Sequence, residues 1–199
     1  DITSEIANSF KNSIAIDTEA TGLQIPERDK LSLIQICDEN GNVFIIQPNK
    51  NNFEAPNLVS VLENEKILKI GHYLRFDKNA LEFFLKCKMK NIFDTKIASK
   101  IVRTYTDSHG LKNLVQEFCN KSLDKRQGSS DWNKDIDELS DKQLEYAAND
   151  VIYLHKIKTQ LEVMLTRENR MDVFKKCLAF LDTRVKLDQS GFKFDIFEH

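Results

Sequence analysis

The chain has 199 residues, the size of one domain or of two small ones. Its 6 glycines and 3 prolines are too few for collagen, low-complexity sequence or long flexible linkers, so regular structure should dominate. The 29 basic and 31 acidic residues give a net charge of −2, which excludes the basic body of a protein that coats nucleic acid without specificity. Any contact with nucleic acid should therefore be local.

Cysteine usage and hydropathy indicate a cytoplasmic protein with no membrane partner. The four cysteines lie far apart and form no Cys-x-x-Cys pair, which argues against a zinc site and is typical of buried thiols in a reducing compartment. No stretch of 18 apolar residues occurs, and the first ten residues lack the apolar segment of a signal peptide.

The first part of the chain is predicted to form strands. In the run 31–37, Leu31, Leu33 and Gln35 alternate with Ile34 and Ile36, as in a strand. The turn-forming residues that follow predict a hairpin into the next run, so the first three strands should pair antiparallel. The predicted strands span residues 13–17, 31–37, 42–46, 67–70 and, as a short fifth, 91–93.

Helices are predicted to prevail after the fourth strand. Asp94 is a plausible N-cap, and Ser140 with Gln143 three residues later forms a capping box. A long polar loop is expected at 120–135. The order of strands and helices predicts an α/β fold with a mixed sheet flanked by helices. The predicted helices cover 58–63, a segment from Leu74, 95–102, 111–118, a segment from Ser140 and 167–187.

Four acidic residues and one tyrosine are candidates for a site. Asp17 and Glu19 lie two apart at the end of the first strand, so both side chains share one face of the sheet. Asp77 follows the fourth strand. Tyr146 and Asp150 are spaced i to i+4, which places them on one face of a helix. Taken singly, each has an ordinary structural interpretation as a solvated acid, a helix first-turn acid or a core tyrosine.

Together, these residues and their spacing resemble the DEDD superfamily of 3′-to-5′ exonucleases, tyrosine subtype. Segment 16–23 looks like the first motif of that superfamily, and segments 123–132 and 144–154 look like ribonuclease D in particular. The resemblance covers about 14–165. It implies a ribonuclease H-like fold in a single exonuclease domain over 1–199. That domain would have its core at 14–165 and a C-terminal helix and tail at 166–199, without the helical nucleic-acid-binding extension of longer ribonuclease D proteins.

The resemblance also implies a chemistry and the role of each residue. The reaction would be hydrolysis of phosphodiester bonds from a 3′ end with release of nucleoside 5′-monophosphates, assisted by two divalent ions, Mg²⁺ or Mn²⁺. Asp17 would bridge both ions, Glu19 and Asp150 would hold the ion that activates water, and Asp77 would act on the second, largely through water. Tyr146 would orient the attacking water.

Substrate contacts are expected from residues beside these acids. By the resemblance, the backbone of Ala20 and Thr21 and the side chain of Leu23 abut the terminal nucleotide; an ordinary loop leucine is the alternative for Leu23. His72 is a further candidate, and Tyr73 stands where the family commonly has Asn. Residues 66–103 carry ten basic and three acidic residues, so phosphate contacts are predicted mainly there. The candidates are Arg75, Lys78, Arg103, Lys125 and Arg126.

The favoured substrate is the single-stranded 3′ end of RNA, such as a transfer RNA precursor or another structured RNA. A proofreading-type 3′-to-5′ DNA exonuclease is the nearest alternative, because the metal chemistry does not involve the 2′-hydroxyl. An inactive nucleic-acid-binding module is a third, which the complete set of acids argues against. The lack of appended binding domains leaves a homodimer open.

Overall fold

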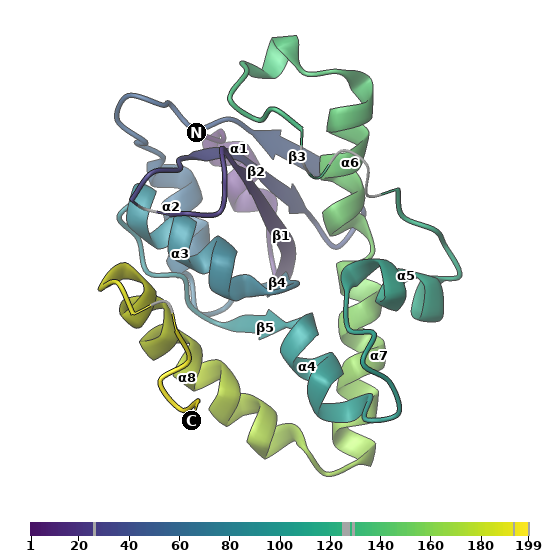
Figure 1. Cartoon of the computed structure of the whole chain (residues 1–199). Coiled ribbons are helices and arrows are strands. Elements are labelled where there is room, and N and C mark those ends of the chain that lie inside the picture. The colour runs from purple at the N-terminus through teal and green to yellow at the C-terminus, as the bar shows by residue number, and fades with distance from the viewer. Residues whose placement is uncertain (26, 125–127, 129, 193, 199) are drawn as a thin grey trace.

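The computed structural model describes residues 1–25, 27–124, 128, 130–192 and 194–198. One mixed sheet of five strands forms its centre, in the order β3-β2-β1-β4-β5 (Figure 1). The strands match the predicted runs, and β1 extends three residues beyond the predicted end. They are β1 (Ser13–Ala20), β2 (Leu31–Cys37), β3 (Val43–Ile46), β4 (Leu68–Gly71) and β5 (Ile92–Asp94).

The pairing agrees with the sequence. β1, β2 and β3 pair antiparallel, with Asp17 opposite Gln35 and Glu19 opposite Leu33, while β4 and β5 run parallel to β1. The carboxyl ends of β1, β4 and β5 therefore meet at one edge of the sheet, where ligand sites of α/β proteins gather. The predicted mixed sheet and ribonuclease H-like fold class are confirmed.

Helices cover both faces of the sheet (Figure 1). The helices α1, α2 and α3 pack on one face, α6 and α7 pack on the other, and α8 crosses the β5 side against α3, α4 and α7. The helices are α1 (Ser4–Ser9), α2 (Pro56–Glu63), α3 (Leu74–Phe84), α4 (Thr95–Val102), α5 (Leu111–Cys119), α6 (Asp141–Ile152), α7 (Leu154–Arg167) and α8 (Met171–Gln189). None of the described helices is long and apolar enough to span a bilayer.

The alternation of β1 separates two cores. Ile14 and Ile16 pack into the core under α1, α2 and α3, whereas Ala15 faces the core formed with α4, α5 and α7. Because helices cover both faces, every residue of β2 is buried, including Gln35. The alternating pattern alone would be typical of a strand with one solvated face.

Two helices were not predicted from the sequence. α1 has only six residues, too short for a clear apolar period, and α7 directly follows α6 with only Tyr153 between them. Because the helical periodicity is strong on both sides of Tyr153, the sequence does not show that α6 ends and α7 begins there. The four cysteines are thiols, and Cys37 and Cys87 are buried as expected, whereas Cys177 is exposed on α8.

Candidate active site

Three of the four predicted acids come together at the carboxyl end of β1. Carboxylate oxygens of Asp17, Glu19 and Asp150 lie within 4.8 Å of one another. Asp17 and Glu19 share a face of β1, and α6 carries Asp150 across that same face, where it packs on β1, β2 and β3. The spacing of Tyr146 and Asp150 predicted that they share one face of α6, and this face brings Asp150 to Asp17 and Glu19.

The start of α6 is held by the predicted capping box. Ser140 and Gln143 exchange hydrogen bonds, and the Gln143 amide also donates to the backbone carbonyl of Asp131. This contact ties the loop before α6 to the helix. Trp132 of that loop is buried with Leu33 and packs against the ring of Tyr146, at 6.1 Å between ring centroids. Trp132 therefore acts as a packing residue that supports the tyrosine.

The Tyr146 hydroxyl faces the three acids. Its pKa is raised well above the usual range, first because the phenol is buried and then because Asp150, Glu19 and Asp17 lie nearby. The hydroxyl therefore stays protonated at neutral pH, and its hydrogen bond to Asp150 orients it. Such a group positions a water molecule rather than removing a proton from it.

The donor set fits a divalent cation. Three like charges this close repel one another unless a cation lies between them. All the offered ligand atoms are carboxylate oxygens, the hard ligands that Mg²⁺ and Mn²⁺ prefer over thiolate or imidazole. The cluster can therefore hold a metal ion.

Asp77 is placed differently from the other three acids. Its side chain is 3% exposed and accepts a hydrogen bond of 2.6 Å from the Thr18 hydroxyl. Thr18 alternates with Asp17 and Glu19 along β1, so its side chain leaves the opposite face of the strand. Burial is the main cause that raises the pKa of Asp77, and the Thr18 hydrogen bond opposes it. Asp77 is not part of the three-carboxylate group.

The loop after β1 presents Leu23 to solvent. Thr21 closes the loop through its backbone NH and its hydroxyl, both bonded to Lys30. The Asp29 carboxylate accepts from the Gln24 backbone NH and lies so close to Gly22 that a Cβ there would clash. Ala20 ends β1 beside an irregularity in the strand pairing. On this loop, Leu23 is 86% exposed, and its contact with a nucleotide stays a prediction.

The turn between β4 and α3 places Tyr73 in a left-handed backbone conformation with φ +69°. Asparagine tolerates this conformation better than most residues, which is a physical reason for the family's common Asn and leaves the tyrosine here without a structural explanation. The buried Asp94 carboxylate holds the turn by accepting from the backbone NH groups of Tyr73 and Leu74. Asp94 also caps α4, as predicted, and His72 bonds to Thr95 through Nδ1.

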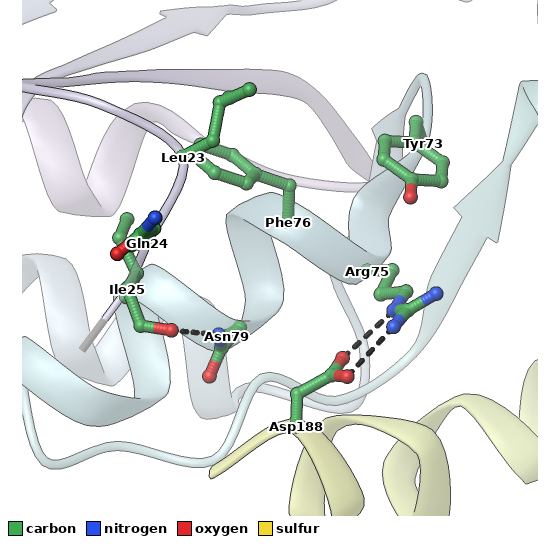
Figure 2. A pocket seen from close by; sticks show the side chains of 8 residues that line it. All are labelled: Leu23, Gln24, Ile25, Tyr73, Arg75, Phe76, Asn79 and Asp188. Carbon is green, nitrogen blue, oxygen red and sulfur yellow. Dashed lines mark hydrogen bonds and ion pairs between the residues drawn. The ribbon is translucent and has the colours of Figure 1, made fainter. Parts of the chain in front are cut away.

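A pocket of about 280 Å³ lies at the same edge of the sheet. Figure 2 shows that its walls come from the loop after β1, from the start of α3 and from the end of α8. Two aromatic and two aliphatic residues form much of the wall, which suits a nucleobase. The lining residues are Leu23, Gln24, Ile25, Tyr73, Arg75, Phe76, Asn79 and Asp188.

Arg75 closes one end of the pocket. Its guanidinium donates two hydrogen bonds to the Asp188 carboxylate, of 2.8 and 2.7 Å (Figure 2). Arg184 donates a third hydrogen bond of 2.9 Å to the same carboxylate. Asp188 lies 113 residues away on α8, so the sequence pattern did not reveal it. The bidentate pair with Asp188 holds the Arg75 side chain in place and links α8 to α3. Arg75 is one of the residues predicted to contact phosphate.

Asp188→Asn should lower the free energy of unfolding by about 1–3 kcal/mol, because two guanidinium groups lose their charged acceptor. Urea denaturation would measure the change. Asp172→Asn is the matched control, since Asp172 pairs with Lys176 on the exposed side of the same helix and should change stability by less than about 1 kcal/mol. Equal effects in both variants would contradict a structural role for the Arg75–Asp188 pair.

Two predicted phosphate contacts are wrong. Lys78 and Arg103 are 0% and 1% exposed, and each already pairs with carboxylates. Lys78 contacts Glu82 and Asp182, and Arg103 contacts Glu117. Burying an uncompensated charge is costly, so these cations serve the fold. Lys125 and Arg126 lie outside the described residues, and their role stays a prediction.

Sequence reasoning also missed Thr18, Phe76 and Asn79. Thr18 contacts Asp77, and the other two line the pocket. A signal existed for Phe76, which adjoins Asp77, and for Asn79, which lies about one turn beyond Arg75 on the same helix. No local pattern marked Thr18, because its partner lies 59 residues away.

The chain matches known proteins over most of its length. Residues 1–166 match the 3′-5′ exonuclease family. DNA polymerase I of Aquifex aeolicus is 32% identical over 92% of the chain, and ribonuclease D of Haemophilus influenzae is 34% identical over 79%. The chain spans 32% and 38% of the lengths of these two relatives.

Solved structures agree with this match. The structure of Brucella melitensis NrnC bound to pGG is 44% identical with a TM-score of 0.89, and that of NrnC with bound Mg²⁺ is 44% identical with a TM-score of 0.87. Each alignment covers 95% of this chain and 91% of the NrnC chain. The chain therefore belongs to the 3′-5′ exonuclease family, as a ribonuclease D-like member of the DEDD superfamily.

Proposed function

We propose that this chain is a metal-dependent exonuclease that removes nucleotides from the 3′ end of single-stranded RNA and releases nucleoside 5′-monophosphates. The observation that carries the proposal is the group of Asp17, Glu19 and Asp150 with the Tyr146 hydroxyl against it. This group lies at the sheet edge that also holds the pocket lined by Leu23 and Phe76.

The three carboxylates would hold divalent cations, two Mg²⁺ or Mn²⁺ in the full site. When bound, such ions lower the pKa of water and neutralise charge on the scissile phosphate. Tyr146 would direct the attacking water through its hydroxyl. For Asp77, which the structure places outside the three-carboxylate group, a role at the second ion through water stays a prediction of the family resemblance.

The pocket would receive the terminal nucleotide. The base would contact Leu23 and Phe76, and the backbone at Ala20 and Thr21 would lie along the terminal sugar. Arg75, held by Asp188, would face a phosphate from the end of the pocket. His72 and Lys125 are further proposed substrate contacts, His72 from the turn after β4.

The size of the pocket favours a single-stranded 3′ end over a folded stem. Its volume of about 280 Å³ suits one nucleotide unit rather than a helical stem, and the related NrnC has been solved bound to pGG. We infer that short RNA oligonucleotides are cleaved readily and that transfer RNA precursors are trimmed at their single-stranded 3′ ends.

A second candidate function is 3′-to-5′ hydrolysis of DNA. The relationship to Aquifex aeolicus DNA polymerase I favours it, and no described contact requires a 2′-hydroxyl. One assay separates the two candidates: 5′-labelled RNA and DNA of the same sequence, from two to twenty nucleotides long, incubated with Mn²⁺ or with EDTA.

In Mn²⁺ we expect both substrates to shorten from the 3′ end, RNA faster than DNA of the same sequence. In EDTA we expect no cleavage. Faster shortening of DNA would favour the second function. Cleavage that persists in EDTA, or internal cuts, would refute the metal-dependent exonuclease. Light scattering on the same preparation would test the homodimer, which stays a prediction.

A further inference from the structure

Gln35 is a buried polar residue without a structural role in the described part of the chain. It is 0% exposed in the middle of β2, yet neither the amide nitrogen nor the amide oxygen has a hydrogen-bond partner among the described residues. Folded proteins satisfy the great majority of such groups, because an unpaired buried amide loses its bonds to water without replacement. An isosteric apolar side chain would therefore stabilise the fold better at this position.

The position of Gln35 links it to the acidic cluster. It lies directly opposite Asp17 in the β1–β2 register, so the two side chains leave the same face of the sheet. Residues directly opposite in an antiparallel pair have Cβ atoms about 5 Å apart, within the reach of a glutamine amide. Leu33 and Ile45, which share this face, pack with Tyr146 and Ala147 of α6.

Around the Gln35 amide, few groups other than the carboxylates of the site can form a hydrogen bond with it. The neighbouring side chains on this face of β2 and β3 are apolar, and no solvent reaches the residue. The carboxylate of Asp17 can accept several hydrogen bonds, and an amide N–H donates one without adding charge. A donor behind a metal-binding carboxylate fixes the direction of its lone pairs.

We propose that Gln35 is a positioning residue for Asp17. With a divalent cation held by the three carboxylates, the Gln35 Nε2 would donate a hydrogen bond to one Asp17 oxygen, and the other oxygen would be available to the cation. The inference rests on the proposed function, because it assumes that the cluster holds a metal. We further infer that the fold accepts the unpaired buried amide of Gln35 because this amide strengthens metal binding.

Gln35→Met separates this role from a structural one, because it keeps the volume and removes both polar atoms. We expect its melting temperature in EDTA to equal or exceed that of the wild type. We expect its affinity for Mn²⁺, measured by calorimetry without RNA, to fall by roughly 10- to 100-fold, the usual effect of losing such a partner. Gln35→Leu is the second variant, in case methionine disturbs packing.

Gln143→Met is the matched control, since Gln143 is also buried but has partners for both amide atoms. It should melt at a lower temperature than the wild type and keep its Mn²⁺ affinity. Wild-type Mn²⁺ affinity in both Gln35 variants would overturn the inference alone. Failure of the wild type to bind Mn²⁺ would instead sink the proposed function, so the two failures are distinguishable.

Discussion

Asp17→Asn should reduce the rate of RNA hydrolysis by roughly 10³-fold or more. A divalent cation contributes several kcal/mol to such a reaction, and about 1.4 kcal/mol corresponds to a tenfold change in rate. Asp17 belongs to the three carboxylates within 4.8 Å of one another, and asparagine keeps its shape while removing its charge. The ladder assay in saturating Mn²⁺ measures the loss.

The same variant should be more stable than the wild type when no metal is present. Without metal, removing one of three repelling charges should raise the melting temperature in EDTA. Mn²⁺ should raise the melting temperature of the wild type, because it binds only the folded state, and should do so far less in the variant. Glu145→Gln on the exposed side of α6 is the control and should behave as the wild type. If Asp17→Asn cleaves RNA as fast as the wild type, the assignment of the acidic cluster as the active site is wrong.

Tyr146→Phe should lower kcat by roughly 10²-fold and leave the Mn²⁺-induced rise in melting temperature intact. The expected size is that of a positioned catalytic group. The ring would still pack against Trp132, so only the hydroxyl is removed. Because a phenol with its usual pKa of about 10 is protonated at neutral pH, the pH profile of the remaining activity should keep its wild-type shape there.

Tyr105→Phe is the control for removing a phenol elsewhere. Tyr105 is exposed and donates to Glu117, away from the acidic cluster, so its loss should not change kcat. A fully active Tyr146→Phe would show that the hydroxyl does not position water. Loss of an entire limb of the pH profile would show that the tyrosine acts as a base.

Much of the site followed from local patterns. The spacing of two between Asp17 and Glu19 and of four between Tyr146 and Asp150 predicted which side chains share a face, and the structure brings three of these acids together. The N-cap at Asp94 and the capping box at Ser140 predicted where two helices begin. These features depend on backbone geometry within one element, which the order of residues sets directly.

The positions of cations could not be predicted in the same way. The sequence shows a basic segment at 66–103, but it does not show which of those charges meet a carboxylate. Lys78 and Arg103 are buried against Asp182 and Glu117, whereas Arg75 is held at the pocket by Asp188. Ion pairs of this kind form between elements far apart in the chain, and only packing decides them.

By itself, the sequence determined the strands, most helices, the mixed sheet and the family of this protein. Tertiary structure decided that Asp77 is buried against Thr18 instead of joining the other acids, and that Gln35 is fully buried opposite Asp17 on the neighbouring strand. The physical reason is that helices cover both faces of the sheet. A residue's exposure and partners then depend on what packs over it, which periodicity within one strand does not contain.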